Sequence, residues 1–345
     1  MCSALSREEE KQVQEALEFI MNRISTVFFR KLIITIKKYG KTNPAMKRAV
    51  LKSLIPIHQF LSRYGDDQKS TRERYFRCLI WYTLYLGKYH GKTVFEVTDA
   101  EITGFINWMN YKRSFANNTK VLMLKVLKAF YRFHERGDIV KKLSKWKFVT
   151  ENRFKVDLTQ EEFERLLRCT DDPRIKLGIL LMGESGLRLG EVLGLRWGDV
   201  KEEDGHVFVE IKFRAGEKYG AKGRSSEGIV PVSMRAAEIL RELKQMYIEK
   251  YHTLPPKGMR IVNISRQRFY QKFKRAAKKA GIKKDYPLTP HKLRHFFGHQ
   301  FLKKVKDISK LKVLLRHRNI QTTLLYVEPT KSEILEAYYK EFLGK

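Results

Sequence analysis

The sequence has few cysteines, no long apolar run and far fewer acidic than basic residues. Its three cysteines, Cys2, Cys78 and Cys169, are far apart and odd in number, so they fit a reducing compartment and not a disulfide framework. No apolar run approaches the roughly 20 residues that a membrane span needs. The N-terminal stretch SREEEKQ is acidic and does not match a signal peptide. We therefore expect a cytoplasmic protein without membrane association.

The excess of basic over acidic residues gives the chain a large positive charge. Lys and Arg number 70 against 38 Asp and Glu, which gives the 345 residues a formal net charge of +32. Such a chain repels itself unless a polyanion is present, which favours nucleic acid as the partner. Charged residues, dominated by Lys and Glu, make up 31% of the chain, above the usual level of about 25%. This composition indicates a thermophilic source.

The first 150 residues are predicted to be helical. In residues 1–66, Ser6 and Glu9 match a capping box, and apolar residues then recur every three or four positions. This stripe predicts either a helix that packs on its own domain or a short self-association helix. After a linker-like GDDQKS stretch, residues 67–150 are predicted to form a helical DNA-binding domain that ends in a linker, and Thr98 with Glu101 matches a capping box within it.

Basic side chains line these helices and recur in two later segments. Each alone can be an ordinary solvated charge, but together with the net charge they favour a surface that follows a DNA backbone. The residues expected to contact DNA are Arg72, Lys120, Lys125, Arg214, Arg224 and Lys292.

Residues 151–330 are predicted to be of mixed structure. Thr159 and Glu162 match a capping box, and the alternating segment 206–213 predicts a strand whose partner is 229–233. A long polar, glycine-containing loop joins the two strands. Helices are expected at 234–250, 266–280, 291–304 and 307–316, with a last one in 331–345. The predicted fold class is mainly α with a small antiparallel β-sheet.

Five side chains in the second half suit attack on a phosphodiester: Arg188, His291, Arg294, His317 and Tyr326. Negative charge builds up on the non-bridging oxygens during cleavage, and two planar, permanently charged guanidiniums can hold them. A tyrosine nucleophile gives a covalent phosphotyrosine link, which stores the energy of the broken bond. The sequence agrees with this chemistry, because it has no GxxxxGK[ST] motif for a nucleoside triphosphate.

Further residues complete the candidate site. Glu191 lies three positions after Arg188 and can brace its guanidinium. A lysine in the polar loop, Lys222 or Lys218, can protonate the departing 5′ oxygen. Histidines at 291, 295 and 299 have a spacing that could place a metal on one helical face. The flanking charges are positive, however, so we expect no metal and give His291 a role in proton transfer or phosphate binding.

Three segments resemble the tyrosine recombinase (integrase) family. GLRLGEVLGLRWGDV is similar to its first arginine box, TPHKLRHFFGHQFL to its H-x-x-R box, and LLRHRNIQTTLLYV to the box that ends in the nucleophile. The match covers roughly 155–330, and the helical block at about 71–145 resembles the family's core-binding domain by pattern and position. The helices before residue 65 and the composition resemble integrases of archaeal viruses and plasmids.

The resemblance implies a role for each residue. Arg188 and Arg294 would hold the scissile phosphate, His291 would assist proton transfer, and His317 would hydrogen-bond the phosphate. Tyr326 would form a 3′-phosphotyrosine, while a hairpin lysine protonates the 5′ oxygen. Four protomers would pair two duplexes at a specific attachment site and exchange strands through a Holliday junction, with the C-terminal helix docked on a neighbour. No cofactor is implied.

The sequence departs from the family pattern at two places. The hairpin loop is longer than usual, and counting back from the second strand favours Lys222 but leaves Lys218 open. Arg316 stands where the family usually has a glycine. Two other functions are weighed: a type IB topoisomerase, which usually has a serine-lysine pair where this chain has Thr-Thr-Leu-Leu, and a non-catalytic DNA-binding protein of the same fold, which a complete set of candidates argues against.

Overall fold

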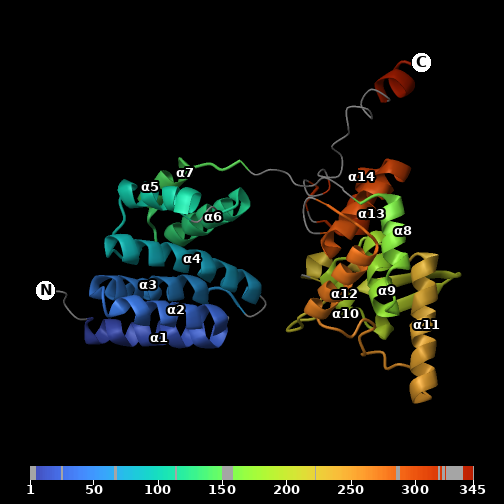
Figure 1. The fold of residues 1–345 in the computed structure, drawn as a ribbon, viewed down its shortest axis with the longest axis horizontal. Coiled ribbons are helices and arrows are strands. Elements are labelled where there is room, and N and C mark those ends of the chain that lie inside the picture. The colour runs from blue at the N-terminus through green and yellow to red at the C-terminus, as the bar shows by residue number, and fades with distance from the viewer. Residues whose placement is uncertain are drawn as a thin grey trace. The chain divides into compact units, whose positions relative to one another are not determined.

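The structure is a computed structural model of the chain. It describes residues 5–24, 26–65, 68–112, 115–149, 158–221, 223–284, 288–317, 319–320, 323 and 337–344. Contacts divide the chain into an N-terminal unit, Met1–Asn152, and a C-terminal unit, Arg153–Lys345 (Figure 1). Lys222 and Tyr326 lie outside the described residues.

The N-terminal unit is built from helices in its described part. These are α1 (Arg7–Arg23), α2 (Thr26–Gly40), α3 (Pro44–Ser62), α4 (Lys69–His90), α5 (Asp99–Asn107), α6 (Asn117–Phe133) and α7 (Gly137–Ser144), with a π-helical turn at Trp108–Lys112. Local signals set their starts. The predicted capping boxes of Ser6 with Glu9 and Thr98 with Glu101 are both present. Gly91, at φ 64°, ends α4 in the left-handed conformation that glycine adopts most readily.

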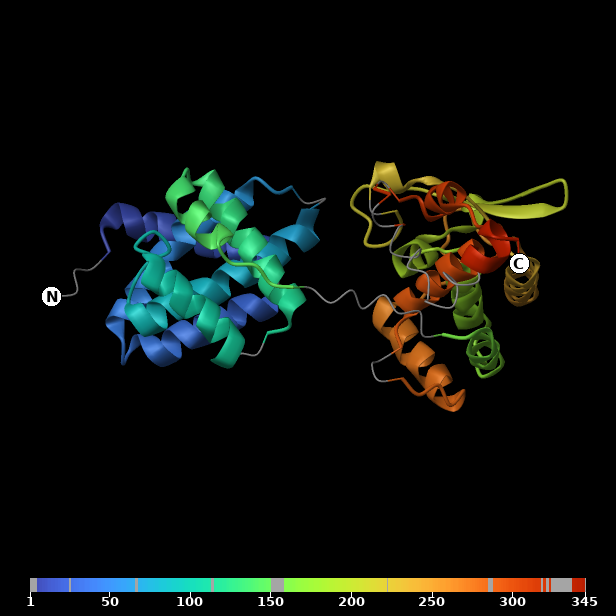
Figure 2. The ribbon, with the colours of Figure 1, turned by 90° about the horizontal axis from the view of Figure 1, so that it is seen from above.

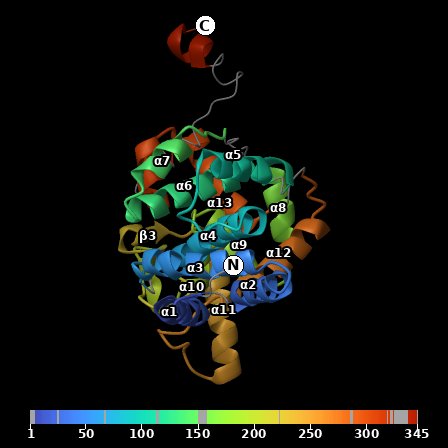
Figure 3. The same ribbon diagram turned by 90° about the vertical axis from the view of Figure 1, so that its left-hand side faces the viewer.

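One apolar core runs through the N-terminal unit. Helix α3 packs against α4, α1 and α2 (Figures 1 and 3). The apolar stripe buries Ile20 and Ile24 in this core, so it packs on its own unit, as the first of the two interpretations has it. The core also contains Phe60 of α3 and Tyr82 of α4. The segments that the sequence separates at residue 66 therefore share one core.

The C-terminal unit combines helices with a small sheet in its described part. Its helices are α8 (Gln160–Arg168), α9 (Pro173–Gly183), α10 (Leu189–Gly194), α11 (Met234–Tyr251), α12 (Arg266–Lys279), α13 (Pro290–Val305) and α14 (Ile308–Leu315). Short 3₁₀ turns lie at Trp197–Asp199 and Arg224–Ser226, and a π-helical turn at Ala337–Phe342. The predicted capping box of Thr159 and Glu162 begins α8.

The sheet of the C-terminal unit has the order β1-β2-β3 and is antiparallel throughout. Strand β2 (His206–Ile211) pairs with β3 (Gly228–Pro231), as predicted, and its alternate residues Val207, Val209 and Ile211 are buried. Strand β1 (Val200–Glu203) was not predicted. It joins β2 through a two-residue Asp-Gly turn with positive φ at both positions, the usual geometry of a tight hairpin. Figure 2 shows this hairpin projecting from the helices.

Helix α9 lies at the centre of the C-terminal unit. It contacts α13, α11, α10 and α12, and nearly every residue from Ile175 to Gly183 is buried. Two of its glycines admit aromatic rings, since a Cβ on Gly178 would overlap Phe269 and a Cβ on Gly183 would overlap Phe163. This packing fixes the positions at which α10 and α13 begin, which is where the candidate site lies.

Candidate active site

Arg188 and Glu191 form the predicted pair at the start of α10. Arg188 is the N-cap of this helix, with extended backbone angles of φ −78° and ψ 148°. Glu191 accepts the backbone N–H of Arg188 at 2.7 Å and its Nη1 at 2.8 Å. The expected contact is present, and it joins the two residues as the two ends of a helix cap. The carboxylate of Glu191 is 1% exposed and the side chain of Arg188 31%.

The turn before Arg188 is held against two other segments. Gly186 has φ 68°, a conformation that disfavours side chains. A Cβ there would also lie 2.5 Å from the ring of Phe297 in α13 and 2.9 Å from Leu315 in α14. Glycine at this position therefore lets the first arginine box contact the H-x-x-R box and the segment that leads to His317.

Arg294 links the same three segments from the interior. It is 1% exposed. Its Nη2 donates to the carbonyl of Leu315 at 2.5 Å, and its Nη1 donates to the carbonyl of Gly186. Nη1 also lies 3.9 Å from Oε2 of Glu191. A buried guanidinium needs such acceptors and a counter-charge, so Arg294 helps to fix the arrangement of the site.

A third arginine, Arg316, was not expected in the site. Its Nη2 donates to Oε2 of Glu191 at 2.6 Å, and its side chain is 4% exposed. We define the arginine cluster as Arg188, Arg294 and Arg316 around Glu191. Three positive charges and one negative charge leave it a net +2. The only sequence signal for Arg316 was the replacement of the family's usual glycine.

The two histidines at the start of α13 have lowered pKa values. Desolvation of its ring, followed by the charges of Arg294 and Arg188, lowers the pKa of His291. His295 is buried, and desolvation lowers its pKa to about 3. Their rings are in edge-to-face contact, with centroids 4.7 Å apart. Both imidazoles are therefore neutral at pH 7.

His317 follows Arg316 directly and lies beside the arginine cluster. It is 9% exposed, and its Nδ1 lies 3.0 Å from the hydroxyl oxygen of Thr323. Desolvation, and then the charges of Arg294 and Arg188, lower its pKa to about 3. The structure thus places His317 and His291 close enough to Arg188 and Arg294 for their charges to lower both pKa values, although these segments are far apart in the sequence.

The loop between β2 and β3 packs on α10. The N–H of Gly220 donates to the carbonyl of Gly190 at 2.9 Å, and a Cβ on Gly194 would lie 2.5 Å from the nitrogen of Gly220. The N–H of Ala221 then donates to the carbonyl of Lys212 at 3.2 Å. The loop is thus held on the helix that begins after Arg188, immediately before position 222.

Lys218 lies in the same loop but borders a different space. Its Nζ is 5.6 Å from the ring centroid of Tyr219. Together with Arg196 and Arg260 it lines a pocket of 510 Å³. Arg260 also lies over the Tyr219 ring, with its guanidinium carbon 5.5 Å from the centroid.

Two of the expected DNA contacts are used inside the protein. Arg72 is 2% exposed, and its guanidinium donates to the carbonyls of Arg23, Tyr64 and Gly65. This burial contradicts the expected surface role, so we do not propose Arg72 as a DNA contact. Arg214 donates to both carboxylate oxygens of the buried Asp199, at 2.6 and 2.8 Å. It anchors the start of the β2–β3 loop.

The other expected contacts lie nearer the surface. Lys125 and Arg224 are exposed, whereas Lys120 and Lys292 are half-buried. Lys120 lies over the ring of Phe148, with its Nζ 5.4 Å from the centroid. Contact of these four residues with DNA stays a prediction.

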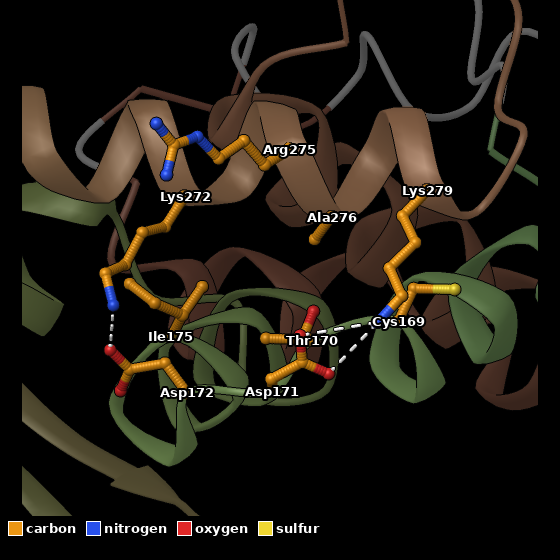
Figure 4. A pocket seen from close by; sticks show the side chains of 9 residues that line it. All are labelled: Cys169, Thr170, Asp171, Asp172, Ile175, Lys272, Arg275, Ala276 and Lys279. Carbon is orange, nitrogen blue, oxygen red and sulfur yellow. Dashed lines mark hydrogen bonds and ion pairs between the residues drawn. The ribbon is translucent and has the colours of Figure 1, made fainter.

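A separate pocket of 370 Å³ lies between the α8–α9 junction and α12 (Figure 4). Its acidic groups are paired across the gap, Asp172 with Lys272 at 2.5 Å and Asp171 with Lys279 at 3.3 Å. Cys169 lines it, but none of the predicted catalytic residues does. Its contacts hold α12 to the start of α9 and do not contribute to the candidate site.

Two negative findings apply to the described residues alone. Within the described ranges, no group of three or more His, Cys, Asp or Glu side chains could hold a metal ion. Over the same ranges, none of the helices combines the length and the apolar character needed to cross a membrane.

Comparisons with known proteins place the chain in a family. The phage integrase family matches residues 157–333. Tyrosine recombinase XerA of Thermococcus kodakarensis is 30% identical over 233 residues, which are 66% of this chain and 77% of the relative. This relative agrees with the archaeal resemblance of the sequence.

Solved structures share the fold. XerH site-specific recombinase bound to difH substrate, in a pre-cleavage complex, has a TM-score of 0.61 at 17% identity and covers 97% of each chain. A lambda integrase tetramer bound to a Holliday junction has a TM-score of 0.57 at 17% identity, over 78% of this chain and 76% of that one. Since the family match spans more than half of the 345 residues and the XerA relative is 30% identical over most of its length, this chain belongs to the phage integrase family of tyrosine recombinases.

Proposed function

We propose that Tyr326 of this recombinase attacks a DNA phosphate bound at the arginine cluster. As a member of its family, the chain is a site-specific recombinase that cleaves and rejoins DNA. The observation that carries the proposal is the convergence of three arginines on one buried carboxylate, Glu191. The excess positive charge of this cluster attracts a phosphate and stabilises the negative charge that develops on its oxygens. Arg188, the most exposed of the three, is the first to meet it.

The chemistry conserves phosphate ester bonds. The Tyr326 oxygen forms a bond to phosphorus while the bond to the 5′ oxygen breaks, which leaves a 3′-phosphotyrosine and a free 5′ end. For rejoining, a 5′ hydroxyl attacks the phosphotyrosine and releases the tyrosine. Each step exchanges one ester for another, so the reaction needs no nucleoside triphosphate.

The neutral histidines suit proton transfer and hydrogen bonding. His291, whose pKa is lowered, can accept the proton of the Tyr326 hydroxyl as a general base. The hydroxyl of Thr323 can donate to Nδ1 of His317, which leaves Nε2–H to donate to a phosphate oxygen. The ring of His317 can donate in this way as a neutral imidazole, because its pKa is lowered to about 3.

Lys222 is the proposed acid for the 5′ oxygen. The N–H of Gly220 donates to the carbonyl of Gly190 in α10, and that of Ala221 to the carbonyl of Lys212, so the described part of the loop is held on the helix that follows Arg188 up to the residue before Lys222. Lys218 lies instead beside Tyr219 in the pocket with Arg260. This difference supports Lys222 and keeps Lys218 as the alternative.

The proposed partner is double-stranded DNA with a specific attachment site, bound by four copies of the chain. The net charge of +32 supports a DNA partner. The XerH structure is bound to difH substrate and the lambda integrase tetramer to a Holliday junction, which supports the same arrangement here. Within it, the N-terminal unit would contact DNA and residues 331–345 would dock on a neighbouring protomer.

Covalent trapping tests the proposal. Wild type and Tyr326→Phe are incubated with nicked duplexes whose central segment is randomised, so that the target need not be known. Adducts that survive denaturation are isolated and their DNA is sequenced. We expect wild type alone to yield adducts, enriched in one sequence. Tyr338→Phe removes an exposed tyrosine of the same terminal segment and should still react. An adduct with Tyr326→Phe would show that another residue is the nucleophile.

A further inference from the structure

Arg316 has a backbone conformation that favours glycine. It is the C-cap of α14, with φ 53° and ψ 45°. Residues with a Cβ adopt this left-handed conformation at a cost in free energy. The contacts of the side chain must offset this cost, so they show what the arginine does.

The guanidinium of Arg316 is buried and faces Glu191. Its Nη2 donates to Oε2 of that carboxylate at 2.6 Å, and its Nη1 to the carbonyl of Leu314 at 2.9 Å. Its aliphatic part passes the β3 end of the hairpin, where a Cβ on Gly228 would lie 3.1 Å from Cδ. With 4% of the side chain exposed, the charge is directed at the carboxylate and not at solvent.

Glu191 therefore has two guanidiniums at hydrogen-bonding distance, and the two differ in exposure. Arg188 is 31% exposed and bonds Oε1, whereas Arg316 is 4% exposed and bonds Oε2. A phosphate that binds both terminal nitrogens of the Arg188 guanidinium must compete with Glu191 for them. Without Arg316 the buried carboxylate would keep only Arg294, whose Nη1 lies 3.9 Å from Oε2, beyond hydrogen-bonding distance, and would strongly oppose the exchange.

We propose that Arg316 is a positioning residue that remains on Glu191 when Arg188 turns to the scissile phosphate. The inference rests on the proposed function and deepens it. Arg316 keeps the carboxylate neutralised and in place, so that Arg188 can exchange its bond to Glu191 for the phosphate. The Cδ of Arg316 also lies close to Gly228 at the start of β3, which links this carboxylate to the β2–β3 loop that bears the proposed acid.

The inference differs from a direct effect of charge on DNA. If Arg316 acts through the Glu191 carboxylate, its effect disappears once that carboxylate is made neutral. If it acts on the phosphate by its own charge, its effect persists.

Four variants test this difference: Arg316→Met, Arg316→Lys, Glu191→Gln and the Glu191→Gln/Arg316→Met double variant. Rates of adduct formation are measured on the sequence that wild type selects. We expect Arg316→Met to react about 10- to 100-fold more slowly, with unchanged affinity for the intact duplex. Arg316→Lys should recover part of the rate, because it keeps the charge but loses the fork. The double variant should react as fast as Glu191→Gln alone.

Each outcome decides a separate point. A wild type that forms no adduct would refute the proposed function itself. If wild type reacts and Arg316→Met keeps pace with it, the inference alone is wrong. Should Arg316→Met not fold, the double variant replaces it, because removing Arg316 together with Glu191 leaves neither member of this ion pair without its partner. A double variant slower than Glu191→Gln would overturn action through Glu191.

Discussion

Both units bury an arginine almost completely, but the partners differ. In the N-terminal unit the guanidinium of Arg72 donates to the backbone carbonyls of Arg23, Tyr64 and Gly65. These carbonyls lie at the ends of α1 and α3, where a helix leaves such acceptors without intrahelical donors. The arginine closes a junction between helices, which is a structural task.

In the C-terminal unit the buried arginines share a carboxylate. Arg294 also donates to backbone carbonyls, but it lies beside Glu191 together with Arg316 and the partly exposed Arg188. This unit therefore holds more positive charge in its interior than its acidic partner neutralises. The difference teaches that burial of an arginine alone does not identify a site, whereas an excess of charge around one carboxylate does.

The largest expected effect is on catalysis, from Arg188→Ala. We expect cleavage to slow by about 10²- to 10³-fold, because one donor to the developing charge is lost. Stability should change by less than about 1 kcal/mol, since Arg188 is partly exposed and Glu191 keeps its ion pair with Arg316. Single-turnover adduct formation and a denaturant melt measure the two effects, with exposed Lys201→Ala as the control. Normal cleavage by Arg188→Ala would remove the cluster from the mechanism.

Arg72→Met should give the opposite pattern. We expect a loss of about 3 kcal/mol in unfolding free energy, because buried carbonyls lose charged donors. Adduct formation per folded molecule should not change. Arg74→Met, an exposed arginine on the same helix, should stay within about 0.5 kcal/mol of wild type. Fluorescence suits this measurement, as three of the four tryptophans, Trp81, Trp108 and Trp146, lie in the N-terminal unit. Loss of cleavage in folded Arg72→Met would erase the contrast between the units.

Acid should destabilise the C-terminal unit through its buried histidines. His295 and His317 have pKa values of about 3, below the unfolded value of about 6.5. The unfolded state then binds more protons, so their contribution is complete above pH 6.5 and is lost as pH falls toward 3. As the pH falls from 7 to 5, each of the two histidines should lower the free energy of unfolding by about 2 kcal/mol.

Chemical denaturation at both pH values measures this loss. His295→Gln cannot titrate and should show a smaller decrease from pH 7 to 5 than wild type. Carboxylates with pKa values near 2, such as Glu101 and Asp172, titrate at lower pH and do not enter this window. Equal decreases in both proteins would mean that His295 is protonated in the folded state.

Local signals made much of the fold predictable. Capping boxes at Ser6, Thr98 and Thr159 begin helices where expected, because each motif is complete within four residues. The alternation of 206–213 likewise predicted β2. Strand β1 was missed because its residues Lys201–Glu203 are all exposed, so no alternation appears in them.

The candidate site was predictable only in part. Spacing within each box placed Arg188, Arg294 and His317, but the partner of Arg316 is 125 positions away, and no local pattern reports such a contact. The burial of Arg72 did have a signal. Arg72 lies three positions before Tyr75 and seven positions before Leu79, so it continues the apolar stripe of α4. A basic residue on an apolar stripe indicates an internal hydrogen bond sooner than a DNA contact.

The smallest expected effects compare one helix cap from each unit. Thr98→Ala and Thr159→Ala should each cost about 1 kcal/mol, because a backbone N–H loses its acceptor. Thr98 should cost more, since its hydroxyl also donates to the buried carboxylate of Glu101 at 2.6 Å, and hydrogen bonds to charged groups contribute about 1.5–3 kcal/mol. Serine at each position keeps the hydroxyl and should restore most of the loss. Denaturant melts of the four variants rank the costs. If Thr159→Ala proved the more costly, the hydrogen bond to the buried Glu101 carboxylate would not govern the stability of the N-terminal unit in the way that the buried charge of Arg72 does. The contrast between the two units would then rest on the arginine cluster alone.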